Sequence, residues 1–223
     1  MSSRHALVLG ATGLIGTRCV EHLLASSAYS RVTCIVRRPL GKTSDKLVAR
    51  VVDFSRLTPS DVDPEADLFC AIGTTMKKAK TRENFREVDF AIPLRVAELA
   101  VQARTKRIAL VSSVGADARS HNFYLRTKGE LEEALAKLPL LAFHVLRPSL
   151  LMGERAERRP GEAMASVVMR AAASLLGGGL RKYRAIDGDD VARALVAAML
   201  GPDPDPPRNV YEHDEILRLS ARM

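Results

Sequence analysis

A tyrosine and a lysine on one predicted helix, with two serines upstream, form a set of residues that could perform acid–base chemistry. Tyr124 and Lys128 have Y-x-x-x-K spacing, and residues four apart lie on one face of a helix. A free tyrosine, with a pKa of about 10, exchanges protons poorly at neutral pH. A neighbouring ammonium stabilises the phenolate and lowers that pKa. Ser112 and Ser113 end a predicted strand just upstream, and either hydroxyl could hold a substrate oxygen beside the phenol, with Ser113 preferred.

A glycine-rich turn near the N-terminus predicts a site for a dinucleotide. The sequence GATGLIG lies between an apolar run at 6–9 and a segment with helical periodicity at 14–25. Glycines tolerate the backbone angles of a tight strand-to-helix turn, and the N–H groups at a helix N-terminus bind a pyrophosphate. The predicted cofactor contacts in this turn are Gly10, Ala11, Thr12, Gly13, Leu14, Ile15 and Gly16.

The ends of the next strands indicate which dinucleotide binds. The second strand, 31–36, is followed by Arg37 and Arg38 instead of an acidic residue. Two guanidinium groups suit a 2′-phosphate, whereas an acid would accept from the free ribose hydroxyls of NAD. The cofactor predicted is therefore NADP(H).

The ends of the third and fourth strands offer further cofactor contacts. Asp53, at the end of the third strand, is either an acceptor for the adenine amino group or a cap. Ile72, Gly73 and Thr74 follow the fourth strand, where the cofactor ribose should pass and Gly73 would allow close approach.

Short apolar runs that alternate with helical segments predict an α/β fold. Strands are expected at 6–9, 31–36, 48–53, 68–72, 108–112 and 142–146, and helices at 14–25, 82–104 with a break near Pro93, and 122–137. This alternation is typical of βαβ units in a doubly wound parallel sheet, the Rossmann fold. We expect a single domain over 1–223, with a dinucleotide-binding core at 1–150. Residues 151–223 would form a small substrate-side annex, with helices at 162–176 and 191–200, the latter capped by Asp189 or Asp190, and a strand at 208–213.

Composition narrows the class of partner. The chain has 223 residues, 47% of them hydrophobic and 27% charged, which excludes a disordered, collagenous or coiled-coil chain. The net charge is +8, but no run of five like charges occurs, aromatic residues make up only 4% and Trp is absent. Base stacking on aromatic side chains is therefore disfavoured. We expect a small-molecule substrate and neither a nucleic acid nor a membrane as partner.

The cysteines and histidines indicate neither disulfides nor a metal. Cys19, Cys34 and Cys70 are odd in number and lie in apolar stretches, as expected of buried thiols. The five histidines are scattered without ligand spacing. The first apolar run is too short for a signal peptide, and no stretch of about 18 uncharged apolar residues occurs. These features lead to the expectation of a cytoplasmic protein.

The glycine turn, the strand-end serines and Tyr-x-x-x-Lys together resemble the short-chain dehydrogenase/reductase superfamily, in its extended or atypical branch. More closely, CAIGTT, SSVGADARSHNFYLRTKGELE and LRPSLLMGERAERRPGE resemble the Tat-interacting metastasis-suppressor protein family and its bacterial relatives. The resemblance implies a Rossmann fold, NADPH binding and a Ser-Tyr-Lys apparatus. It also implies cofactor contacts from Leu151 and Arg159, besides the glycine turn, Arg37, Arg38, Ile72, Gly73, Tyr124 and Lys128. Where the superfamily often has Asn on its fourth helix, this chain has Asp89, which departs from the usual proton relay.

Two functions fit these residues. The first is an NADPH-dependent oxidoreductase that transfers a hydride to or from a small carbonyl or alcohol, with Tyr124 as acid and base. The alternative is a non-catalytic NADPH-binding regulatory or redox-sensing protein that acts through protein partners. The sequence does not specify the substrate, since residues 150–180, which would set it, offer few polar groups. Apolar helix faces make a homodimer one expectation.

Overall fold

The central feature of the molecule is a seven-stranded sheet in which every pair of neighbours is parallel. The computed structural model describes residues 3–152 and 183–223. The strand order is β3-β2-β1-β4-β5-β6-β9. The chain builds the sheet outwards in one direction from β1 to β3 and in the other from β4 to β9, which is the doubly wound Rossmann topology predicted from the sequence. The strands are β1 (Arg4–Leu9), β2 (Tyr29–Val36), β3 (Leu47–Val51), β4 (Asp67–Cys70), β5 (Arg107–Val111), β6 (Ala142–Leu146) and β9 (Arg208–Tyr211).

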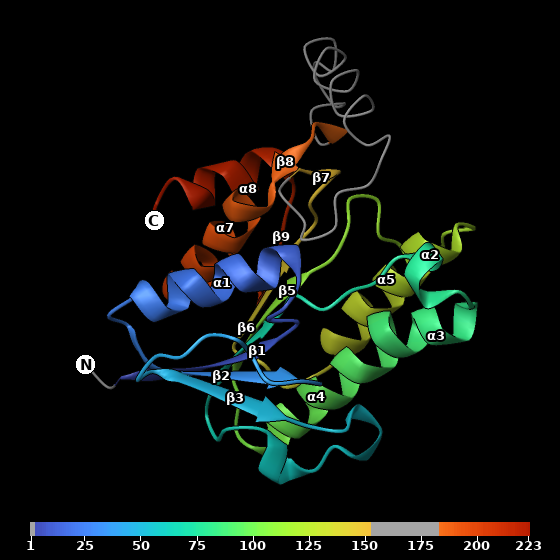
Figure 1. Ribbon diagram of the computed structural model, residues 1–223. Coiled ribbons are helices and arrows are strands. Elements are labelled where there is room, and N and C mark those ends of the chain that lie inside the picture. The colour runs from blue at the N-terminus through green and yellow to red at the C-terminus, as the bar shows by residue number, and fades with distance from the viewer. Residues whose placement is uncertain (1–2, 153–182) are drawn as a thin grey trace.

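Helices cover both faces of the sheet (Figure 1). On one face lie α1 (Leu14–Ala25), α7 (Gly188–Leu200) and α8 (His213–Ser220); on the other lie α4 (Ile92–Gln102) and α5 (Phe123–Leu135). Alternate residues of β1 enter separate cores: Val8 packs with the α1 and α7 cluster, while Leu7 and Leu9 pack with the α4 and α5 cluster. Because both faces are buried, the exposed carboxyl edge of the strands is where a ligand can bind.

The helical stretch 82–104 is continuous at the point where a break near Pro93 was expected. It consists of α3 (Arg82–Arg86), a π-helical turn (Glu87–Ala91) and α4. Pro93 lies in the first turn of α4, where its missing N–H and fixed φ are tolerated. The π-turn immediately before the proline therefore absorbs the irregularity without ending the helix. A short helix, α2 (Met76–Ala79), and 3-10 turns at Phe54–Arg56 and Pro59–Asp61 complete this half.

The described part of the C-terminal region is built into the same sheet. The strand β9 pairs with β6, and the small pair β7 (Leu151–Met152) and β8 (Ile186–Asp187) lies beside it. Asp187, and not Asp189 or Asp190, caps α7, since its carboxylate accepts from the Asp189 N–H at 2.8 Å. Gly188 packs on α1: a Cβ there would lie 2.9 Å from Leu14 Cγ. Arg159 and the helix expected at 162–176 lie outside the described residues.

Two kinds of feature are absent from residues 3–152 and 183–223. None of the described helices is both long and apolar enough to cross a membrane. Within the same ranges, no cluster of three or more His, Cys, Asp or Glu side chains could hold a metal ion. The three cysteines are free and buried, as predicted.

Candidate active site at the carboxyl edge of the sheet

The glycine-rich turn packs backbone against backbone at the end of β1. Gly10 has φ +93°, and a Cβ there would lie 2.5 Å from Ala71 C and Ile72 N. A Cβ at Gly16 would lie 2.0 Å from the Gly10 carbonyl oxygen. Both positions therefore require glycine, because a side chain would separate the turn from α1 or from the segment after β4. The turn is thus held against the loop that also carries Gly73.

The N-terminus of α1 is accessible to a bound anion. Gly13 is the N-cap residue and provides no side-chain cap, and the first turn of the helix contains no acidic residue. A Cβ at Gly13 would approach no atom closer than 3.3 Å, and the glycine is exposed. The first N–H groups of a helix carry partial positive charge and lack intrahelical partners. This turn therefore fits the pyrophosphate of a dinucleotide, as predicted for residues 10–16.

Two exposed arginines follow β2. Val36 is buried at the end of the strand, whereas Arg37 and Arg38 are exposed. Within the described ranges, no hydrogen bond or ion pair occupies either guanidinium group. Both guanidinium groups are therefore exposed at the carboxyl end of β2, the strand that pairs with β1.

A pocket of about 390 Å³ opens between the glycine turn, α1 and the loop after β2. Its lining is mainly apolar, with two threonine hydroxyls and one ammonium group. The lining residues are Ala11, Thr12, Thr17, Val20, Leu40, Gly41, Lys42 and Leu47. The volume lies within the range of small-molecule sites.

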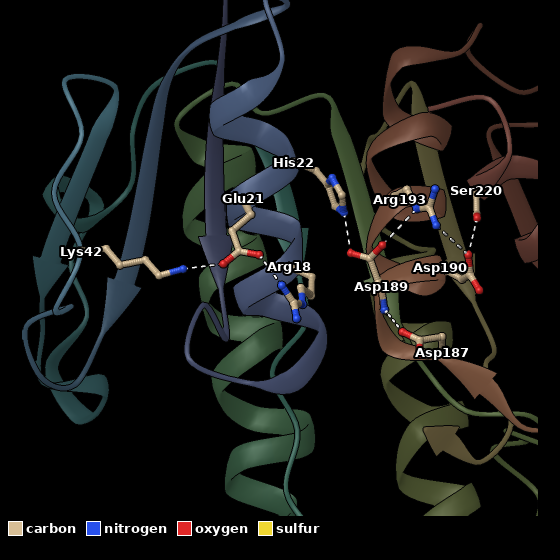
Figure 2. Close-up of polar contacts among 9 residues, drawn as sticks. All are labelled: Arg18, Glu21, His22, Lys42, Asp187, Asp189, Asp190, Arg193 and Ser220. Atoms are coloured by element: carbon tan, nitrogen blue, oxygen red, sulfur yellow. Dashed lines mark hydrogen bonds and ion pairs between the residues drawn. The ribbon is translucent and has the colours of Figure 1, made fainter. Parts of the chain in front are cut away.

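Ion pairs hold the walls of this region together (Figure 2). Lys42 donates to Glu21 of α1, and Arg18 donates to the other carboxylate oxygen of Glu21 at 2.9 Å. The hydrogen bond from Lys42, with the one from Arg18, holds the pKa of Glu21 below its usual value. On the other side of α1, His22 Nε2 lies 2.8 Å from Asp189 Oδ1. The helix carrying the glycine turn is therefore tied to both the β2–β3 loop and α7.

Asp53 caps the 3-10 turn after β3. Its Oδ1 accepts from the Ser55 N–H at 2.9 Å and from the Ser55 hydroxyl at 2.7 Å, and these bonds lower the pKa of the Asp53 carboxyl. Of the two roles left open by the sequence, the structure shows the cap. Both hydrogen bonds use Oδ1, and the side chain is exposed. The adenine contact stays a prediction.

A buried ion pair lies beneath the loop that follows β4. Lys128 Nζ is 2.7 Å from Asp89 Oδ1, and the two side chains are 5% and 1% exposed. The other oxygen, Asp89 Oδ2, accepts from the Thr74 N–H at 2.8 Å. A Cβ at Gly73 would lie 3.3 Å from Asp89 and 3.6 Å from Lys128. Burial alone would lower the pKa of Lys128, but Asp89, with Tyr124, outweighs it and holds that pKa above its ordinary value.

Tyr124 lies one helical turn before Lys128 and acts on it electrostatically. It is half-buried, and its ring packs on Phe85 of α3 with centroids 5.7 Å apart. No hydrogen bond to its hydroxyl is recorded from the residues that the structure describes. Gly129 lets the loop after β5 approach the same helix, since a Cβ there would lie 2.2 Å from Ala118 N. The phenol is thus fixed by its ring, and its hydroxyl is left for a ligand.

The two candidate serines have different surroundings. Ser112 is buried and donates to Glu132 Oε1 at 2.5 Å. Glu132 also accepts from Arg147 at 2.6 Å and Arg208 at 2.8 Å. Ser113 is half-buried, and within residues 3–152 and 183–223 its hydroxyl has only a long contact of 3.4 Å to the Val114 carbonyl. Ser113 is therefore the serine whose hydroxyl is available, while Ser112 belongs to a structural network.

The remaining predicted contacts are distributed along the same edge. Ile72 is half-buried and packs on the α4 and α5 core, while Leu151 packs on the α1 and α7 core. Burial raises the pKa of Cys70, at the end of β4, to about 12, so this thiol is not a nucleophile at neutral pH. Reasoning from the sequence missed Phe85, Glu132 and Lys42. Nothing in their local patterns distinguishes them from an ordinary core aromatic and ordinary surface charges.

The chain matches known proteins over most of its length. A model described as the NAD dependent epimerase/dehydratase family covers residues 6–212. The mitochondrial protein fmp52 of Aspergillus niger is 38% identical over 202 residues, which are 86% of this chain and 85% of that protein. Protein HTATIP2 of Rattus norvegicus is 36% identical over 171 residues, 74% of this chain and 70% of that protein. These relatives confirm the family resemblance predicted from the motifs.

One expectation is corrected by the same relatives. Proteins that are 38%, 36% and 34% identical, from Aspergillus niger, Scheffersomyces stipitis and Candida albicans, are named mitochondrial. The expectation of a cytoplasmic protein is therefore wrong. It was based on the lack of a signal peptide and of a long apolar span, and neither feature distinguishes one compartment from another.

Solved structures show the same fold at low sequence identity. MoeE5 in complex with UDP-glucuronic acid and NAD has a TM-score of 0.70 and 21% identity, over 99% of this chain and 82% of that chain. UDP-glucose 4-epimerase from Thermotoga maritima with UDP-glucose has a TM-score of 0.66 and 18% identity, over 98% of this chain and 82% of that chain. Together with the match over residues 6–212, these findings place the chain in the NAD dependent epimerase/dehydratase family.

Proposed function

We propose that this protein is an NADP-dependent oxidoreductase of the short-chain dehydrogenase/reductase type, which transfers a hydride to or from a small carbonyl or alcohol substrate. The observation that carries the proposal is the position of Tyr124. Among the residues that the structure describes, its hydroxyl has no hydrogen-bond partner, and it acts electrostatically on Lys128, which lies beneath Gly73 at the carboxyl edge of the sheet. An unpaired phenol next to a charged ammonium suits proton transfer.

Each residue of the site would have a separate role. Bound NADP(H) would supply the hydride chemistry. Tyr124 would give a proton to the carbonyl oxygen, or take one from the alcohol, while Lys128 stabilises the phenolate and binds the cofactor ribose. Ser113, whose hydroxyl makes only one long contact in the described part of the chain, would hold the substrate oxygen beside the phenol. Ser112 would support the strand end through Glu132.

The preference for NADP over NAD rests on this chain's own residues. Arg37 and Arg38 are exposed after β2, and the pocket beside Thr12 is lined by a third cation, Lys42. No acid follows β2 to accept from the ribose hydroxyls. The related fold solved with NAD is only 21% identical, so its cofactor does not determine the choice here. Guanidinium groups should favour the nucleotide with the additional phosphate.

Calorimetry with NADPH and NADH tests the cofactor assignment. We expect NADPH to bind at least roughly ten-fold more tightly, a difference of about 1.4 kcal/mol, and the Arg37→Ala, Arg38→Ala double variant to lose this preference. A wild-type preference for NADH, or a preference that survives in the double variant, would refute it.

A screen of small carbonyl compounds with NADPH, followed by absorbance, tests catalysis. We expect oxidation of NADPH by at least one compound, and its abolition in Tyr124→Phe without loss of NADPH binding. Full turnover by this variant would remove Tyr124 from the mechanism. Tight NADPH binding without turnover of any compound would favour the non-catalytic regulator instead.

A further inference from the structure

Asp89 occupies an unusual place in the backbone. It lies in the π-helical turn Glu87–Ala91 that joins α3 to α4, and π-turns inside helices are frequent at functional sites. Glu87 in the same turn is exposed, whereas the Asp89 side chain is only 1% exposed. The turn therefore directs a carboxylate inwards, to the side where α5 carries Lys128.

The two oxygens of Asp89 meet two different donors. Oδ1 lies 2.7 Å from Lys128 Nζ, and Oδ2 accepts from the Thr74 N–H at 2.8 Å. An asparagine has only one acceptor oxygen and would place its own N–H₂ against the other donor. It could not satisfy both. The side chain at this position must therefore be a carboxylate if the ammonium and the backbone after β4 are to be held together.

We infer that Asp89 is the positioning residue for Lys128: it fixes the ammonium against the Gly73–Thr74 backbone and supplies its counter-charge. The consequence for catalysis rests on the proposed function, because the loop after β4 is where the cofactor ribose would pass. The arrangement itself is independent of that function. A Cβ at Gly73 would lie 3.3 Å from Asp89 and 3.6 Å from Lys128, so only a bare backbone separates the ion pair from the open edge.

The charge of Lys128 depends chiefly on the Asp89 carboxylate. Among the described residues, the groups acting on it are Asp89, Tyr124 and Cys70. Cys70 is a protonated thiol, because burial raises its pKa to about 12. Burial lowers the pKa of Lys128 and Asp89 raises it, with a net rise. Removal of the Asp89 charge takes away the largest effect that opposes burial and leaves the smaller effect of Tyr124, so the ammonium should lose its proton at a lower pH.

An NMR titration of the protein labelled with ¹³C-lysine measures this directly and needs no cofactor. The Lys128 resonance is assigned from its absence in Lys128→Met. We expect it to titrate above the ordinary lysine value in the wild type, and at least one pH unit lower in Asp89→Asn. The matched control is Glu87→Gln, in the same turn but exposed, which should not move the midpoint. An unchanged midpoint in Asp89→Asn, or an equal shift in the control, would overturn the inference.

Two further measurements cover other outcomes. If Asp89→Asn does not fold, the double variant Asp89→Asn, Lys128→Met should fold, because the buried ammonium is then absent. Failure of both variants to fold would show that Asp89 acts elsewhere.

The affinity for NADPH provides a second measurement. It should decline with rising pH in Asp89→Asn over a range where the affinity of the wild type is constant, and a constant affinity in the variant would count against the inference. If the wild type binds no NADPH, the proposed function fails while the lysine titration still decides the role of Asp89.

Discussion

Ser112 and Glu132 join β5 to α5 through a buried hydrogen bond of 2.5 Å. Glu132 is 1% exposed and also forms ion pairs with Arg147 and Arg208, whose side chains are 23% and 35% exposed. Four elements, β5, α5, β9 and the segment after β6, therefore meet at one carboxylate. The network thus engages the Ser112 hydroxyl, whereas the Ser113 hydroxyl, proposed to contact substrate, is not part of it.

The two serines should respond differently to removal of the hydroxyl. Ser112→Ala removes a donor from a buried carboxylate, which costs about 1–3 kcal/mol of folding free energy, but it should leave the turnover of folded protein within roughly two-fold. Ser113→Ala should leave the urea midpoint nearly unchanged and reduce turnover by roughly 100-fold, as for a lost group in the transition state. Urea unfolding and initial rates with the best compound of the carbonyl screen measure both. The reverse pattern would assign the substrate contact to Ser112.

Neutralisation of Glu132 should destabilise the fold more than Ser113→Ala does. Glu132→Gln leaves two guanidinium groups without their counter-charge. We expect a loss of about 2 kcal/mol, less than for a fully buried pair because both arginines keep some contact with water. Glu133→Gln, the exposed neighbour, is the control and should unfold like the wild type. Equal midpoints for the two variants in urea would show that the network adds no stability.

The parts of the fold that follow from local pattern were predictable. The bounds of α1 (Leu14–Ala25) and β6 (Ala142–Leu146) agree with the sequence prediction, because apolar periodicity and a glycine or proline at the end define both segments. The glycine turn also lies where expected, since its chemistry depends on consecutive residues. Tyr124 and Lys128 share a helix face for the same reason.

Features that depend on tertiary contacts were not predictable. Glu132 lies in a stretch rich in charges that reads as a solvated helix face, and only β6 and β9 bring Arg147 and Arg208 to it. Asp187 replaces the expected caps of α7, because the helix begins where Gly188 contacts Leu14 of α1. The choice between Ser112 and Ser113 likewise depended on which hydroxyl meets a partner from a distant element.

Stability should depend on pH through His144. This side chain is 2% exposed on β6 and lies 3.0 Å from the Tyr211 hydroxyl. The pKa of His144 is lowered to about 4, chiefly by burial, with Asp203 opposing the shift and Arg107 adding to it. In the unfolded chain the pKa is about 6.5. Between these values the unfolded chain binds the additional proton, so the free energy of unfolding should fall, by up to about 3 kcal/mol, as the pH decreases through this window.

Urea unfolding at constant ionic strength across this pH window measures the effect. His144→Gln removes the titrating ring, so its free energy of unfolding should fall less steeply with decreasing pH than that of the wild type. His121→Gln, an exposed histidine before α5, should keep the wild-type slope. If the free energy of unfolding of His144→Gln changes with pH as steeply as that of the wild type, this histidine binds its proton equally well in the folded and the unfolded chain.

Substitutions at two glycines of the turn should separate an effect on folding stability from an effect on cofactor affinity. In Gly16→Ala the new Cβ would lie 2.0 Å from the Gly10 carbonyl, and we expect a loss of about 1–3 kcal/mol or failure to fold. In Gly13→Ala the nearest contact is 3.3 Å, so the melting temperature should change little. The methyl group would nevertheless cover the open N-terminus of α1 and weaken NADPH binding by roughly ten-fold, about 1.4 kcal/mol. Normal NADPH affinity in a folded Gly13→Ala variant would place the pyrophosphate elsewhere.

The ion pair between Lys42 and Glu21 should modulate affinity for the 2′-phosphate. Lys42 lines the pocket beside Thr12 and donates to Glu21 (Figure 2), so the carboxylate competes with an incoming phosphate for the ammonium. Glu21→Gln should tighten NADPH binding by roughly two- to five-fold and Lys42→Gln should weaken it by a similar factor, the scale of exposed ion pairs. Binding of NADH should not change in either variant.

Arg18→Gln provides the control for net charge in this experiment. Arg18 binds the same carboxylate but is not among the residues that line the pocket. Its loss should therefore weaken NADPH binding less than the loss of Lys42 does, when all three variants are compared by calorimetry at one ionic strength. If Arg18→Gln and Lys42→Gln weaken binding equally, the effect comes from the overall field of α1. In that case the Lys42 ammonium does not contact the phosphate, and Arg37 and Arg38 alone must account for the preference.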